Sequence, residues 1–289
     1  MELQWYPGHM AKTRRLIDEN LKLIDVVVEI IDARVPVSSR NPDFDTLFAA
    51  KPRVVVMNKF DLADERATAA WETWYRESGV PVILTNSMSG KGVDKIAGAV
   101  KGAIADKLAR DAARCVNKAV RLMVVGIPNV GKSSLINRLS GRAAAKTGDR
   151  PGVTKGKQWI RLKNGMEMLD TPGILWPKFE DQTIGMHLAF IGSIRDEIMD
   201  VETLACYLLD YLKGRYAPLL MQRYKLEGDI SAMTGYELLE YIGKKRGFII
   251  SGGEVDTYRG ANVVLDEFRA AKIGRVTLEW PPDDTIGRA

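Results

Sequence analysis

The chain has 289 residues, enough for one large or two ordinary domains, and its 46% hydrophobic and 27% charged content fits a globular protein rather than a disordered one. No apolar run approaches the roughly 20 residues that a membrane helix needs, so no membrane association is expected. The net charge of +5 is uneven: residues 1–180 carry 29 Lys and Arg against 20 Asp and Glu, and residues 181–289 carry 13 against 17, which favours nucleic-acid contact by the first part.

Cysteine usage and the N-terminal sequence indicate the compartment. Cys115 and Cys206 are far apart and lack the paired spacing of a metal site, so disulfides are not expected. The first residues resemble neither a signal peptide nor a transit peptide. We therefore expect a cytoplasmic protein.

Short β-branched runs in the first 180 residues predict strands that are buried on both faces of a mainly parallel sheet. The runs are Val26–Ile31, Val54–Met57, Val82–Leu84, Leu122–Val125 and Met166–Leu169. Helices are expected between them, at Glu65–Glu77, Asp94–Asn117 and Lys132–Leu139. This alternation indicates an α/β, doubly wound domain over residues 1–180, in which ligands bind at the carboxyl ends of the strands.

After about Phe179 the pattern becomes helical. Amphipathic helices are expected at Val201–Leu212, Leu219–Tyr224, Gly235–Gly243 and Gly260–Ala271. Turn signals separate them at Lys213-Gly214, Glu227-Gly228 and Ser251-Gly252-Gly253. We predict a small all-α domain over residues 181–289 that ends in a loose tail at Pro281–Ala289.

A phosphate-binding loop is predicted at Gly126–Ser133. The segment matches G-x-x-x-x-G-K-[ST] directly after a predicted strand and at the start of a predicted helix. Its N–H groups would surround the phosphates, Lys132 would reach the β- and γ-phosphates, and the Ser133 hydroxyl would ligate Mg²⁺. The predicted phosphate contacts are Asn129, Val130, Gly131, Lys132, Ser133 and Ser134.

The identity of the nucleotide base is predicted from Asn58-Lys59-Phe60-Asp61, which matches the N-K-x-D pattern of guanine-specific GTPases. The Asp61 carboxylate can accept from guanine N1–H and N2–H₂, whereas adenine would leave it unpaired. Lys59 would lie along the ring. After the next strand, Asn86-Ser87 stands where a GTPase loop contacts guanine O6 through its backbone. The expected ligands are therefore GTP and GDP.

Recognition of the γ-phosphate is expected from two loops. Asp170-Thr171-Pro172-Gly173 follows the last predicted strand, so Asp170 can hold Mg²⁺ through water and the Gly173 N–H can bond the γ-phosphate. Thr154, in a polar loop upstream, is the candidate that completes the Mg²⁺ shell and acts in catalysis with Gly173.

The order of these motifs is permuted, since both base-reading loops precede the phosphate loop. An ordinary GTPase has the reverse order, so we predict a circularly permuted P-loop GTPase domain, which is tolerable when the original termini lie close together. The switch segments then run directly into the helical domain. The state of the γ-phosphate could therefore move that domain.

The permuted order, together with particular motifs, resembles the bacterial ribosome biogenesis GTPase A family over nearly the whole chain. The motifs are Trp5-Tyr6-Pro7-Gly8-His9-Met10, Asp32-Ala33-Arg34, Arg246-Gly247-Phe248 and Gly253-Glu254-Val255-Asp256. The resemblance implies a GTP-hydrolysing factor for late assembly of the large (50S) ribosomal subunit, with rRNA and ribosomal proteins as partners.

Catalysis must use a group other than the usual glutamine, because Ile174 occupies that position after Asp170–Gly173. We expect slow intrinsic hydrolysis that the ribosome stimulates. The resemblance implies His9 as the catalytic candidate, and similarity to other GTPases with an Asn-Val-Gly-Lys-Ser loop implies that Asn129 holds K⁺.

Basic clusters predict contact with RNA. From Arg138 to Lys163 there are eight Lys and Arg residues and one acid, Asp149. Smaller clusters are Lys12 with Arg14 and Arg15, and Lys244-Lys245-Arg246 beside Phe248.

Three interpretations remain open at this point. They are a GTPase assembly factor, a GTPase of another process such as tRNA modification or membrane signalling, and a nucleotide-sensing scaffold. Off the ribosome we expect a monomer.

Overall fold

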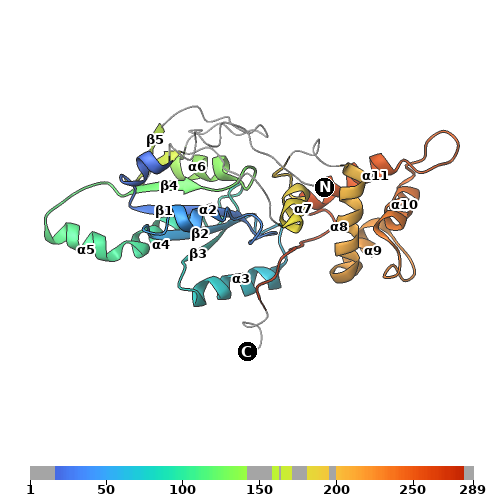
Figure 1. The fold of residues 1–289 in the computed structure, drawn as a ribbon, viewed down its shortest axis with the longest axis horizontal. Helices are drawn as coiled ribbons and strands as arrows, with labels where there is room; N and C mark the ends of the chain where they lie inside the picture. Colours follow the sequence, from blue (N-terminus) through green and yellow to red (C-terminus); the bar gives the residue numbers. More distant parts are fainter. Residues whose placement is uncertain (1–16, 142–157, 163, 171–180, 195–199, 283–289) are drawn as a thin grey trace.

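The computed structural model describes residues 17–141, 158–162, 164–170, 181–194 and 200–282. Its strands form one sheet in the order β3-β2-β1-β4-β6-β5 (Figure 1). The strands are β1 (Val26–Asp32), β2 (Arg53–Asn58), β3 (Val82–Thr85), β4 (Arg121–Val125), β5 (Gln158–Arg161) and β6 (Glu167–Asp170). The five predicted strands are confirmed, whereas β5 was missed.

The strands are parallel except β5, which runs antiparallel to β6. Their register aligns the carboxyl ends, because Asp32 pairs with Asn58 and Asn58 pairs with Thr85. On the other side of β1, Val124 of β4 pairs with Asp170. The loops that follow these strands therefore leave from one edge of the sheet, where open α/β sheets bind ligands.

Helices cover both faces of the sheet. Val55 and Met57 pack in a cluster with Trp71 and Tyr75 of α3 (Glu65–Glu77). Val54 and Val56, which alternate with these residues along β2, belong to the main core on the other face. That core also contains buried residues of α4 (Ile96–Ala103) and α6 (Lys132–Ser140). Alternate residues of a strand point to opposite faces, so this sheet is buried on both sides, as the continuous apolar runs predicted.

The helix expected at Asp94–Asn117 is interrupted. It consists of η1 (Val93–Lys95), α4 and α5 (Ala105–Ala113), because Ile104 leaves helical geometry with its side chain buried. The short helix α2 (Asp43–Leu47) was also missed. The helix predicted at Glu65–Glu77 is confirmed at both ends, and the Asp64 side chain caps its first turn.

The later part of the described chain is helical. The helices are α7 (Gln182–Phe190), α8 (Val201–Arg215), α9 (Ala217–Tyr224), α10 (Gly235–Arg246) and α11 (Thr257–Arg269). No described helix has both the length and the apolarity to cross a membrane. The α7 helix was not predicted, and the turn predicted at Lys213-Gly214 is wrong, because the buried stripe Leu208, Leu209 and Leu212 outweighs the roughly 1 kcal/mol cost of a helical glycine.

After α11 the chain returns to the sheet (Figure 1). We name residues 273–279 the return segment. Its Leu278 N–H donates to Arg34 O at 2.8 Å, and Trp71 Nε1 of α3 donates to Glu279 O at 2.8 Å. Pro281 is buried, so the predicted loose tail does not begin there, and residues 283–289 lie outside the described part. The predicted domain division after residue 180 stays a prediction. The return segment belongs to the later part in sequence, but Leu278 and Glu279 contact the first part.

Candidate nucleotide-binding site

The phosphate loop follows β4 and leads directly into α6. Two glycines are required there. Gly131 has φ +99°, and a Cβ atom on it would lie 2.3 Å from Asn58 Nδ2. A Cβ on Gly126 would lie 2.6 Å from Ile30 O of β1. The loop can therefore fold tightly at the N-terminus of α6, where N–H groups and the helix dipole attract phosphate.

Asn58, the last residue of β2, joins the phosphate loop to the loop after β3. Its Nδ2 donates to Val130 O at 2.8 Å, and its Oδ1 accepts from Ser87 N at 3.0 Å, from Ser87 Oγ at 2.8 Å and from Thr85 Oγ1 at 3.1 Å. Asn58 is only 2% exposed. This side chain therefore organises the site from within and does not itself present a surface to a ligand.

Lys59 lies between the phosphate loop and a buried acid. Its Nζ donates to Asn129 O at 2.7 Å and pairs with Asp32 Oδ2 at 3.0 Å. Asp32, fully buried at the end of β1, also takes a two-point ion pair from Arg34, with Nε and Nη2 at 2.9 and 2.8 Å. Burial raises the pKa of Asp32, but the positive charges of Arg34 and Lys59 outweigh it and hold the pKa well below its usual value.

Asp61 is exposed two residues beyond Lys59, at the strand-end edge of the sheet. Lys59 has φ +59°, and Leu62 N donates back to Lys59 O at 2.9 Å, so residues 59–62 form a tight turn. Lys91 Nζ lies 5.1 Å from the centre of the Phe60 ring. The carboxylate is therefore carried on a constrained turn that faces solvent, as a base-reading group requires.

The loop after β3 is held in place by the side chain of Asn86, one of its own residues. Asn86 Oδ1 accepts from Met88 N and Ser89 N, each at 2.8 Å. The N–H of Asn86 donates to Lys91 O, and that of Ser87 donates to Asn58. The backbone N–H groups of both predicted residues are therefore already used within the protein.

Arg138 of α6 fastens the same loop from the other side. Its Nε donates to Ser87 O at 3.3 Å, and its Nη2 donates to Met88 O. The sequence placed Arg138 in a basic cluster for RNA. The structure instead directs it to the loop after β3, a contact that a charge count could not distinguish.

Asn129 and its neighbour connect the phosphate loop to the turn after α7. Asn129 Nδ2 donates to Gly192 O at 2.7 Å, and Ser193 Oγ donates to Pro128 O at 2.9 Å. Asn129 Oδ1, the atom that could ligate K⁺, is not used by this bond. The helical part of the chain thus touches the phosphate loop directly.

Several predicted site residues cannot be placed in this way. His9, Thr154, Gly173 and Ile174 lie outside the described residues, and so does the side chain of Asp170. The backbone of Asp170 is paired with Val124, two residues before Gly126, so the carboxyl end of β6 lies beside the phosphate loop. Ser133 lies in the first turn of α6. The residue types at these two positions, a serine hydroxyl at Ser133 and a carboxylate at Asp170, are oxygen donors of the kind that Mg²⁺ prefers, so they fit the ion.

The basic cluster at the end of α10 is partly neutralised. Lys245 pairs with Glu227 at 3.0 Å, and Arg246 pairs with Glu267 at 3.3 Å. Arg259 lies 4.6 Å from the centre of the Phe248 ring. Lys244 of the same cluster is exposed. Of the basic residues between Arg138 and Lys163, the structure describes only Arg138 and Arg161. The cluster of Lys12, Arg14 and Arg15 lies outside the described residues.

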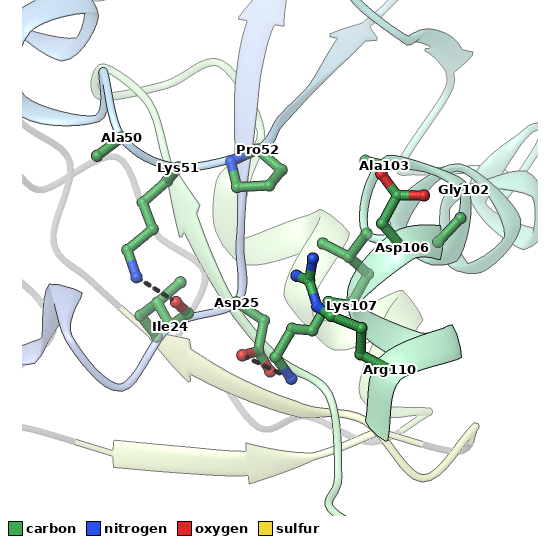
Figure 2. Close-up of a pocket in the computed structure, with 12 residues that line it drawn as sticks. Ile24, Asp25, Ala50, Lys51, Pro52, Gly102, Ala103, Asp106, Lys107 and Arg110 are labelled. Atoms are coloured by element: carbon green, nitrogen blue, oxygen red, sulfur yellow. Dashed lines mark hydrogen bonds and ion pairs between the residues drawn. The ribbon is translucent and has the colours of Figure 1, made fainter. Parts of the chain in front are cut away.

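One hollow of about 440 Å³ lies away from these loops (Figure 2). Asp25 and Pro52, which line it, directly precede β1 and β2, so it lies at the amino ends of the strands. Figure 2 shows Lys51 directed at Ile24 O, at 2.8 Å, and Lys107 directed at Asp25, at 3.2 Å. The hollow is therefore separate from the nucleotide site.

A phosphate loop after an inner strand of a parallel sheet, with the base-reading loops on strands earlier in the chain, defines the class of circularly permuted GTPases. The family model "50S ribosome-binding GTPase" matches residues 121–231. Ribosome biogenesis GTPase A of Priestia megaterium is 48% identical over 285 residues, which cover 98% of each chain. The chain belongs to the ribosome biogenesis GTPase A family, which confirms the predicted fold class and the predicted resemblance.

Solved structures agree with this assignment. GDP-bound YlqF matches with a TM-score of 0.64 and 28% identity, covering 92% of this chain and 99% of that one. GNP-bound YlqF from T. maritima matches with a TM-score of 0.63 and 28% identity, covering 93% and 98%.

Sequence reasoning missed the residues that support the site. Arg34 was noticed only as part of a family motif, and Arg138 only as a charge. The return segment was read as the end of a helical domain. Their partners are distant in sequence, and no local pattern signals such contacts.

Proposed function

We propose that this protein binds and hydrolyses GTP and acts as an assembly factor for late maturation of the large ribosomal subunit. The observation that carries the proposal is the set of hydrogen bonds of Asn58, which joins the phosphate loop and the base-reading loops into one site. The family membership supports the same conclusion. GTP state would control the association with the subunit.

The phosphates would lie on the loop Asn129–Ser134. The N–H groups at the start of α6 and the ammonium of Lys132 would neutralise their charge. Ser133 and Thr154, and Asp170 through water, would hold Mg²⁺, which would supply charge neutralisation at the phosphates when bound. The Gly173 N–H would bond the γ-phosphate.

The guanine would be read by Asp61, whose exposed carboxylate stands on a constrained turn. Lys59 would cover the ring with its stem. The N–H groups of Asn86, Ser87 and Met88 all have protein acceptors, so a contact of this loop with guanine O6 would require one of these hydrogen bonds to open.

Hydrolysis would be slow without help, because Ile174 cannot orient water. We propose that His9 supplies the catalytic contact and that Asn129 Oδ1 would hold K⁺, which would supply positive charge beside the phosphates when bound. The large subunit would speed the reaction by ordering these groups.

The partners would be rRNA and ribosomal proteins of the large subunit. Lys244, exposed at the end of α10, and the basic segment 142–163 are the proposed phosphate contacts. Off the ribosome the protein would be a monomer.

The base assignment is tested by Asp61→Asn. An amide can donate to the 2-oxo group of xanthine, so affinity should move from GDP to XDP by about 100-fold in the ratio. A variant that still prefers GDP would contradict the role of Asp61.

The ribosomal role is tested by multiple-turnover GTP hydrolysis with and without purified large subunits, with small subunits as the control. Stimulation by large subunits alone is expected. Equal rates in all samples would contradict the proposal.

A further inference from the structure

The return segment lies against the turn at residues 59–62, which carries Asp61 and is called the guanine-reading turn below. Arg275 provides the closest link: its Nη2 donates to Phe60 O at 2.9 Å, and its Nε donates to Ala63 O at 2.8 Å. These carbonyls come one residue before and two residues after Asp61. One guanidinium therefore brackets the turn that carries the base-reading carboxylate.

Backbone contacts continue from this bracket. Val276 N donates to Leu62 O at 3.2 Å, and Asp64 N donates to Thr277 Oγ1 at 3.1 Å. Asp64 is also the N-cap of α3, so the turn is fixed to a helix at its far end. Thr277 is fully buried, which excludes water as a competing partner for its hydroxyl.

The other side of the return segment is held by α8 and by Tyr216, the residue that follows it. Tyr211 Oη donates to Leu278 O at 2.7 Å, and Tyr216 Oη donates to Thr277 O at 3.1 Å. Burial raises the pKa of Tyr211 to about 12, so this hydroxyl stays a donor at physiological pH. The segment is thus anchored in the helical part and contacts the guanine-reading turn with its free edge.

We propose that Arg275 is a positioning residue for guanine recognition: it holds the turn so that Asp61 meets the N1–H and 2-amino groups of the base. The inference rests on the proposed role of Asp61. It adds a specificity determinant from the far end of the chain, 215 residues from Phe60.

The physical reason is geometric. A carboxylate gains both hydrogen bonds from guanine only if its plane is set before the base arrives, since otherwise ordering the turn opposes binding. Arg275 fixes the two carbonyls that flank Asp61, and it reaches them with a planar fork that lysine lacks. Without Arg275 the turn keeps its bond to Val276, but Asp61 loses its fixed direction.

The test compares GDP with IDP, whose base lacks the 2-amino group, in the full-length protein. For Arg275→Ala we expect the affinity for GDP to fall about tenfold, the weight of one charged hydrogen bond, while that for IDP falls about twofold or less. The preference for GDP over IDP should therefore shrink. Arg275→Lys should restore only part of it.

Arg223→Ala is the matched control, since Arg223 pairs with Glu267 at 2.9 Å in the helical part, away from the turn. It should leave the GDP to IDP ratio unchanged. If Arg275→Ala does not fold, as judged by thermal melting, Arg275→Lys carries the test with the same ratio.

The outcomes separate the two claims. A wild-type protein that binds GDP and IDP equally overturns the proposed role of Asp61. A wild-type protein that prefers GDP, with an unchanged ratio in the folded Arg275 variant, overturns only the positioning role. An equal loss of both nucleotides also overturns it, because that result indicates general destabilisation.

Discussion

The side-chain amide of Asn129 donates a 2.7 Å hydrogen bond to Gly192 O, so the phosphate loop is tied to the turn after α7. The same side chain is the proposed K⁺ ligand through its Oδ1. Because Asn129 would contact K⁺ through one atom and Gly192 through another, a change of nucleotide could shift the turn after α7.

Replacing Asn129 should remove the response to K⁺. We expect GTP hydrolysis by the wild-type protein to be about tenfold faster in K⁺ than in Na⁺, because a fixed charge beside the phosphates stabilises the transition state. Asn129→Ala should hydrolyse at the Na⁺ rate in both salts. Ser193→Ala, which removes the neighbouring bond to Pro128 O, should keep the K⁺ response. Equal wild-type rates in the two salts would count against the ion.

Replacing Asn58 should separate the two halves of the site. Asn58→Ala leaves the N–H of Ser87 and the carbonyl of Val130 without their partner, a loss of about 3 kcal/mol. We expect GDP affinity to fall about 100-fold, measured by fluorescent nucleotide binding. Asn262→Ala, which removes a side-chain bond to Tyr258 O on α11, serves as the control and should bind normally. Normal binding by Asn58→Ala would refute its organising role.

Replacing Asp32 should destabilise the nucleotide-free protein across the neutral range. Asp32→Asn leaves Arg34 and Lys59 without their buried counter-charge, at a cost of about 3 kcal/mol. Because the pKa of Asp32 is lowered in the folded protein, its contribution is complete above the unfolded value of about 4 and declines only below it. Urea unfolding should give a constant difference between pH 5 and 8. A difference that fades at pH 6 would disprove this explanation.

Replacing Glu279 should loosen the return segment. Its carboxylate accepts from Val37 N and Ser38 N and contacts His187 Nδ1 at 2.9 Å, so it joins the loop after β1 to α7. Glu279→Ala should lower the free energy of unfolding by about 2 kcal/mol, the cost of the unsatisfied N–H groups, as measured by urea unfolding. The exposed Glu254 offers a control, since Glu254→Ala should change stability little. Equal stability of both variants would argue against a stabilising role of the Glu279 contacts.

Local signals explain where prediction succeeded. The helix Glu65–Glu77 begins where it was predicted, and the structure shows that Asp64 caps its first turn. The buried strands were predicted because their apolar runs are continuous. Prediction failed at Lys213-Gly214 and at Pro281, where contacts from elsewhere in the fold override the local preference.

The sequence by itself determined the class of ligand and the family, because residues that contact a nucleotide must occur as specific types at fixed spacing. The phosphate loop, Asn58–Asp61 and their permuted order needed no structure to be interpreted. Only the tertiary structure decided how these motifs are held: Asn58 across 72 residues to Val130, and Arg275 across 215 to Phe60. Such partners meet because the sheet aligns its strand ends and the chain folds back on them, and hydrogen bonds to backbone carbonyls leave no signature in the sequence of the acceptor.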